Sequence, residues 1–132
     1  MPDTSKKSTP APLLIYVVDD EEVLLDLAEV ALTEDGYALK KFQDPRAALE
    51  SFANEPHKPS LLLTDYAMGA MSGIELSTRC KSAHPELKII MVSGTAGPEI
   101  IINAPVEVDE FIGKPYEPEL LARTVRALLK SK

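Results

Sequence analysis

Acidic, hydroxyl and amino side chains directly follow short apolar runs at several places in this 132-residue chain. Asp19 and Asp20 follow the first run, Asp65 and Ser93 end or follow two later ones, and Lys114 follows the last. Clustered carboxylates repel unless a cation joins them, and oxygen ligands with open positions suit Mg²⁺. An aspartate can accept a phosphoryl group, and a lysine and a hydroxyl can bind its oxygens. These residue types indicate phosphoryl chemistry beside a cation, provided that the fold brings them together.

The apolar runs themselves are typical of strands that are buried on both faces. Tyr37 to Phe42 is more mixed in composition, which favours an edge strand. The predicted strands cover residues 13–18, 37–42, 60–64, 87–92 and 111–112.

Helix signals lie between the strands. Asp44 and Pro45 suit an N-cap and a first helical position, Ser72 and Glu75 suit a capping box, and Gly36 suits a helix end. The predicted helices cover residues 21–35, 45–54, 72–84, a short stretch from 98 to 102, and 117–129.

Strands and helices thus alternate five times, which predicts an α/β fold with a parallel sheet and helices on both faces. Right-handed crossovers bring the carboxyl ends of the strands to one edge, where ligands bind in such sheets. The chemical residues are therefore expected to meet there. Helical spacing also groups Leu24, Leu27, Ala28 and Ala31 on the apolar face of the first helix. The last helix is expected to bury Leu120, Leu121, Val125 and Leu128.

Composition predicts one soluble globular domain, since 45% of residues are hydrophobic and 27% are charged. Residues 1–12, rich in Ser, Thr, Pro and Lys, are expected to be a disordered leader before a domain at 13–130. The single cysteine, Cys80, allows no internal disulfide and suits a reducing, cytoplasmic location. No run is long enough for a membrane span, and the start lacks the apolar region of a signal peptide. A net charge of −7 disfavours direct nucleic-acid binding.

Four motifs in order carry a resemblance to a known family: VVDDE at 17–21, LLLTDYAMGAMSG at 61–73, VSG at 92–94 and FIGKP at 111–115. Over residues 13–130 the chain resembles the receiver domain of two-component response regulators. The resemblance implies a flavodoxin-like (βα)5 fold with strand order 2-1-3-4-5.

The resemblance also implies roles for the residues at the rim. Asp65 would be the phosphorylated residue. Asp20 and Asp65 would bind Mg²⁺ directly, Asp19 would bind it directly or through water, and the backbone carbonyl of Ala67 would complete the protein ligands.

A second group of residues would respond to the phosphoryl group. Ser93 would close onto it, Lys114 would pair with it, and the rotamer of Phe111 would follow Ser93. A cis peptide bond before Pro115 would aim Lys114. The implied partners are a sensor histidine kinase or histidine phosphotransfer protein and a downstream protein target, with room for a phosphorylation-dependent homodimer.

The chain departs from the family pattern in two loops. Gly69 stands where the family usually has proline, which predicts a more flexible loop, and Gly94 stands where alanine is common. Between Gly97 and Asp109 the usual helix is interrupted by prolines and acidic residues, so the fourth helix is expected to be short, displaced or mobile.

Other interpretations remain open. Asp19, Asp20 and Glu21 could simply cap the first helix, and Phe111 could be plain core. The chain could be a receiver that binds partners without phosphate, or a Mg²⁺-dependent phosphatase, although such enzymes commonly carry a nucleophile two residues before a second aspartate. Met1 and the leader favour a stand-alone chain, while the motifs also resemble receivers attached to hybrid kinases.

Overall fold

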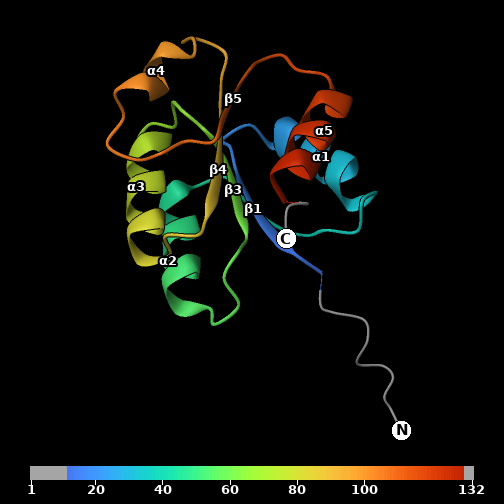
Figure 1. Ribbon diagram of the computed structural model, residues 1–132, viewed down its shortest axis with the longest axis horizontal. Coiled ribbons are helices and arrows are strands. Elements are labelled where there is room, and N and C mark those ends of the chain that lie inside the picture. Colours follow the sequence, from blue (N-terminus) through green and yellow to red (C-terminus); the bar gives the residue numbers. More distant parts are fainter. Residues whose placement is uncertain (1–11, 130–132) are drawn as a thin grey trace, which may run out of the picture.

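The computed structural model describes residues 12–129, in which five helices cover a five-stranded parallel sheet (Figure 1). The predicted leader lies outside the described residues, apart from Pro12. The elements in chain order are β1 (Leu14–Val18), α1 (Glu22–Thr33), β2 (Ala38–Phe42), α2 (Pro45–Asn54), β3 (Leu61–Asp65), α3 (Gly73–Ala83), β4 (Lys88–Ser93), α4 (Glu99–Ile102), β5 (Glu110–Gly113) and α5 (Pro118–Leu129).

The strands lie in the order β2-β1-β3-β4-β5 and all pairs are parallel. Helices α1 and α5 cover one face, while α2, α3 and α4 lie on the other (Figure 1). The predicted fold class and strand order are therefore confirmed. The mixed strand β2 is at the edge, as its composition predicted.

The apolar runs of the central strands β1 and β3 fit their burial on both faces of the sheet. Every residue of β1 and β3 is buried, and successive side chains enter opposite layers. Ile15 and Val17 join the core on the α1–α5 side, whereas Tyr16 and Leu62 join the core under α2 and α3.

Local capping signals also hold. The Asp44 side chain accepts a hydrogen bond from the Arg46 N–H, and the Ser72 hydroxyl accepts one from Glu75. Gly36 ends the α1 region with φ of +90°, a conformation that favours glycine.

The buried helix faces differ in part from those predicted. Leu27 is 41% exposed and Leu120 is 38% exposed, so their expected burial was wrong. Helix α1 buries Ala28 and Ala31 of the predicted set and adds Leu25 and Leu32, because its apolar positions extend round more of the helix than the sheet can cover.

The segment between β4 and β5 contains only a four-residue α4, which confirms the predicted short helix. Asp109 holds the end of this segment against the sheet: its N–H donates to the Ile89 carbonyl at 2.9 Å, and its carboxylate accepts from the Ile89 N–H at 2.8 Å. Val106 and Val108 are half-buried against the core beneath. Within residues 12–129, none of the helices is long and apolar enough to cross a membrane.

Candidate functional site

The predicted site residues meet at the carboxyl edge of the sheet. Asp19 directly follows β1, Asp65 ends β3, Ser93 ends β4, and Lys114 directly follows β5. Backbone hydrogen bonds continue the strand pairing to these positions, from the Asp19 N–H to Phe42 at 3.0 Å and from the Lys114 N–H to Ser93 at 2.9 Å. The sheet thereby holds each side chain at a defined place.

A cavity of about 270 Å³ opens at this rim. Its lining consists of Asp20, Glu21, Asp65, Ala67, Ser93, Gly94, Thr95 and Lys114. Its walls are polar, and its size accommodates a small anion with a cation rather than a large organic ligand.

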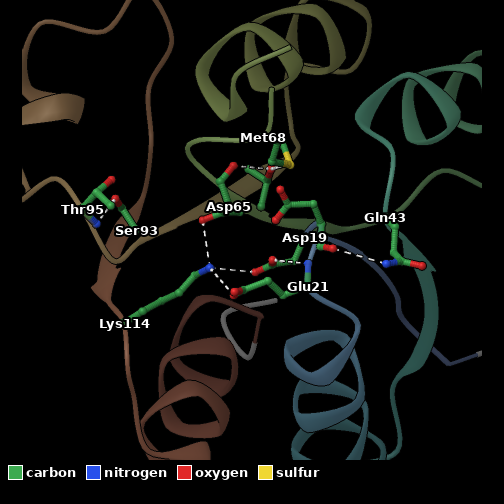
Figure 2. Close-up of polar contacts among 10 residues, drawn as sticks. Asp19, Glu21, Gln43, Asp65, Met68, Ser93, Thr95 and Lys114 are labelled. Atoms are coloured by element: carbon green, nitrogen blue, oxygen red, sulfur yellow. Dashed lines mark hydrogen bonds and ion pairs between the residues drawn. The ribbon is translucent and has the colours of Figure 1, made fainter. Parts of the chain in front are cut away.

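Lys114 is the cation at the centre of this site (Figure 2). Its Nζ lies 3.1 Å from Asp19 Oδ2, 3.1 Å from Asp65 Oδ1 and 3.5 Å from Glu21 Oε1. The Lys114, Asp19 and Asp65 side chains are largely buried, whereas Glu21 is exposed. One ammonium group thus neutralises part of a larger negative charge.

The local charges alter proton affinities. Burial raises the pKa of both Asp19 and Asp65, although the Lys114 ammonium opposes the rise. Burial alone would lower the pKa of Lys114, but its hydrogen bonds to the two aspartates outweigh burial and raise it. The positive charge of Lys114 therefore does not fully offset the cost of burying the ionised Asp19 and Asp65 carboxylates.

This donor set fits a hard divalent cation. One carboxylate oxygen from each of Asp19, Asp20 and Asp65 lies within 4.8 Å of the other two. All are oxygen donors, which Mg²⁺ prefers, and Ala67 lines the same cavity. Because Lys114 does not fully offset the charge of Asp19 and Asp65, a bound cation would also stabilise these carboxylates.

Glu21 was not predicted as a site residue. It occupies the N-cap position of α1, yet its side chain makes no capping hydrogen bond. Its backbone N–H instead donates to Asp19 Oδ1 at 2.9 Å, while its carboxylate approaches Lys114. Capping thus explains part of the Asp19 contacts but not the side chain of Glu21, whose only sequence signal was its place after the acidic pair.

The Ser93 hydroxyl is hydrogen-bonded to the loop that follows it, and Ser93 lines the same cavity as Asp65. Its Oγ accepts hydrogen bonds from the N–H groups of Thr95, at 3.3 Å, and Ala96, at 3.0 Å. Phe111 lies in the middle of β5 and is half-buried against the core under α2 and α3. Its ring is not part of the cavity wall.

Glycine residues shape the loop between Asp65 and α3. Gly69 has φ of +75°, a region that proline cannot enter, so the departure from the family pattern has a conformational cause. A Cβ on Gly73 would lie 2.3 Å from the Asp65 carbonyl oxygen, so α3 can begin this close to β3 only with glycine there. The Lys114–Pro115 peptide bond is cis, as the resemblance implied.

Comparisons with known proteins agree with this fold. Residues 15–126 match the family model of the response regulator receiver domain. A response regulator receiver domain protein (CheY-like) from Methanospirillum hungatei JF-1 is 30% identical, with a TM-score of 0.81 over 90% of this chain and 94% of that one. The receiver domain of NtrX from Brucella abortus is 28% identical, with a TM-score of 0.79 over 89% of this chain and 99% of that one.

A longer relative is the transcriptional regulatory protein CseB of Streptomyces coelicolor, which is 26% identical over 88% of this chain and 49% of its own length. The chain thus spans about half the length of the curated relatives it matches. The chain belongs to the response regulator receiver domain family.

Proposed function

We propose that this chain is a phosphorylatable switch in which Asp65 accepts a phosphoryl group from a phosphohistidine. The observation that carries the proposal is the contact of Lys114 with both Asp19 and Asp65 at 3.1 Å, beside an open cavity. The donor would be a sensor histidine kinase or a histidine phosphotransfer protein, and the recipient of the signal a downstream protein.

In the proposed transfer, a carboxylate oxygen of Asp65 attacks the phosphorus atom of the donor. A phosphorus–oxygen bond forms, the phosphorus–nitrogen bond breaks, and the imidazole nitrogen keeps its electron pair and takes a proton from solvent. Asp65 is held in position because it ends β3 and is paired with Val92 of β4. Positioning and charge neutralisation supply most of the catalysis in such transfers.

Asp19, Asp20, Asp65 and the backbone carbonyl of Ala67 would hold Mg²⁺. When bound, Mg²⁺ supplies positive charge to the oxygens of the transferred group. Lys114 supplies the second positive charge, and its ammonium can exchange the Asp65 carboxylate for a phosphoryl oxygen.

Ser93 would carry the response to the rest of the domain. Its Oγ accepts two backbone hydrogen bonds from the loop before α4, and its own proton remains free for a phosphoryl oxygen. Movement of Ser93 toward Asp65 would pull on or break these bonds and shift the loop. Phe111, on the neighbouring strand β5, would then change its packing.

Helix α1 offers a surface for the phosphodonor protein. Val23, Leu27 and Val30 are 70%, 41% and 63% exposed, and their spacing places them in one stripe. The helix begins two residues after Asp20, so the stripe starts near the rim that a phosphodonor protein would approach. Exposed apolar stripes of this kind pack against an apolar helix face of a partner.

The deciding experiment is phosphorylation of the wild-type chain with a small phosphodonor, followed by intact-mass measurement with and without Mg²⁺. We expect a Mg²⁺-dependent gain of one phosphoryl group in wild type and none in Asp65→Asn. Equal modification of that variant, or none in wild type, would contradict the proposal.

Two other functions, binding without phosphorylation and phosphatase activity, would give different results in related measurements. A receiver that only binds would contact its partner equally well with Asp65→Asn. A phosphatase would turn over a generic phosphate ester, and we expect no such turnover.

A further inference from the structure

Glu21 is the N-cap residue of α1, but its side chain does not cap the helix. The residues that cap helices best have short side chains that reach the first free N–H groups. Glu21 makes no such bond, and its carboxylate extends instead toward Lys114 Nζ, at 3.5 Å (Figure 2). The side chain is therefore not accounted for by helix capping.

The neighbouring acidic residue behaves differently. Glu22 lies in the first turn of α1, where an acid is stabilised by the helix dipole, and it is exposed. No ion pair involves Glu22 in residues 12–129. Of these two adjacent glutamates of equal charge, Glu21 lines the cavity and contacts Lys114, whereas Glu22 is not in the cavity lining.

Phosphorylation changes the other two partners of Lys114. On Asp65, the carboxylate charge is replaced by an acyl phosphate, which carries its charge on the phosphoryl oxygens. Asp19 belongs to the three-carboxylate set that fits a divalent cation. Among the carboxylates of residues 12–129 that contact Lys114, Glu21 is the one that neither change involves.

We propose that Glu21 is a positioning residue that holds Lys114 toward the α1 side of the rim and competes with the phosphoryl group for its ammonium. The proposal rests on the function proposed above and adds a residue to it. Its consequence is that Glu21 weakens the phosphorylated state, because Lys114 must leave Glu21 to bind the phosphoryl oxygens.

The size of the effect follows from exposure. The Glu21 side chain is 64% exposed, and ion pairs with an exposed partner contribute little. We therefore expect a change in phosphoryl affinity of about two- to five-fold rather than of several orders of magnitude.

The first measurement tests the contact itself in the Mg²⁺-free protein. The NMR signal of the Lys114 side-chain Cε should shift in Glu21→Gln and stay unchanged in Glu22→Gln, which removes the same charge one residue away. An unchanged Lys114 signal in Glu21→Gln would overturn the proposal, whatever the protein does with phosphate.

The second measurement tests the competition with beryllofluoride, a stable phosphoryl mimic, titrated at saturating Mg²⁺. Glu21→Gln should bind it about two- to five-fold more tightly than wild type, Glu22→Gln should match wild type, and Glu21→Asp should fall between. Equal tightening by both Gln variants would mean a general charge effect and would overturn the role of Glu21.

The two measurements separate failure of the inference from failure of the proposed function. No saturable binding of beryllofluoride to wild type would contradict both the proposed function and the competition. A shifted Lys114 signal together with normal wild-type binding, but no difference in Glu21→Gln, would overturn the competition alone.

Discussion

At the rim of the sheet, single residues carry charge that the protein compensates only in part. Burial raises the pKa of Asp19 and Asp65 although both contact Lys114. A raised pKa means that the folded state disfavours the ionised form relative to the unfolded chain. The site therefore gives up some stability in order to keep these carboxylates together, as is common at functional sites.

The first prediction concerns Asp65→Asn, which replaces the ionisable group by a neutral one of similar shape. Because the pKa of Asp65 is raised, its contribution to stability is present at low pH and lost as pH rises through the folded-state value. The variant should therefore have a higher urea midpoint than wild type at neutral pH. The difference should vanish below about pH 4, where Asp65 is protonated in both states.

Exposed Glu107 provides the control for that comparison, since Glu107→Gln should leave the midpoint unchanged at both pH values. Added Mg²⁺ should raise the midpoint of wild type more than that of Asp65→Asn. A less stable Asp65→Asn at neutral pH would mean that the folded state does not disfavour the ionised Asp65 carboxylate.

At the scale of elements, neighbouring segments approach both ends of the sheet closely. Helix α3 begins against the last residue of β3, and the Gly73 N–H donates to the Tyr66 carbonyl at 2.8 Å. At the opposite, amino end of β4, Asp109 pairs the end of the atypical 97–109 segment with Ile89.

Gly73→Ala should destabilise the fold, because the added Cβ would lie 2.3 Å from the Asp65 carbonyl oxygen and 2.8 Å from Met91 Sδ. The expected loss is about 1–3 kcal/mol in urea unfolding, the range for overpacking. Gly113→Ala is the matched control, since a Cβ there meets nothing within 4 Å. Equal effects of the two substitutions would show that α3 can move away at little cost.

Asp109→Ala should leave the buried N–H of Ile89 without its carboxylate acceptor. The expected cost is about 1–3 kcal/mol, the penalty for an unpaired buried donor. Faster amide hydrogen exchange at Ile89 than in wild type would locate the effect. Unchanged exchange there would show that the Asp109 carboxylate does not protect this strand end.

Leu27→Asp places a charge in the middle of the exposed stripe on α1 without touching the rim. Transfer from a phosphohistidine protein should slow by about tenfold or more, because a charge in an apolar contact is costly. Modification by a small phosphodonor should stay at the wild-type rate. Loss of both activities would mean that the substitution disturbs the domain rather than docking.

At the scale of the whole molecule, family membership does not determine whether this chain binds DNA. Some relatives are transcriptional regulators about twice the length of this chain, such as CseB of Streptomyces coelicolor. The chain has a net charge of −7, and the acids gathered at the rim add a local negative field. Such a surface repels nucleic-acid phosphates.

We therefore predict that this chain does not bind duplex DNA by itself. Fluorescence anisotropy of a labelled duplex at low ionic strength, where charge effects are strongest, should stay constant as the protein is added. A salt-sensitive rise in anisotropy would contradict this expectation. The control is the same titration in the presence of Mg²⁺ and beryllofluoride.

The order of strands and helices followed from the sequence because its signals are local. Continuous apolar runs predicted buried strands, and Asp44, Ser72 and Gly36 marked helix ends. Because parallel strands end at one edge of the sheet, Asp19, Asp65, Ser93 and Lys114 were expected to meet there. A parallel sheet with right-handed crossovers leaves few other arrangements for such a pattern. The metal and phosphoryl roles of these residues stay predictions.

Only the tertiary structure decided which groups touch. The contact of Glu21 with Lys114 and the link of Asp109 to Ile89 join residues far apart in sequence, where no local pattern specifies a distance. The exposure of Leu27 depends on the rotation of α1 against the sheet, which a shift of one residue changes by about 100°. Side-chain partners and helix rotation are set by packing between elements, and that information lies in no single segment of the chain.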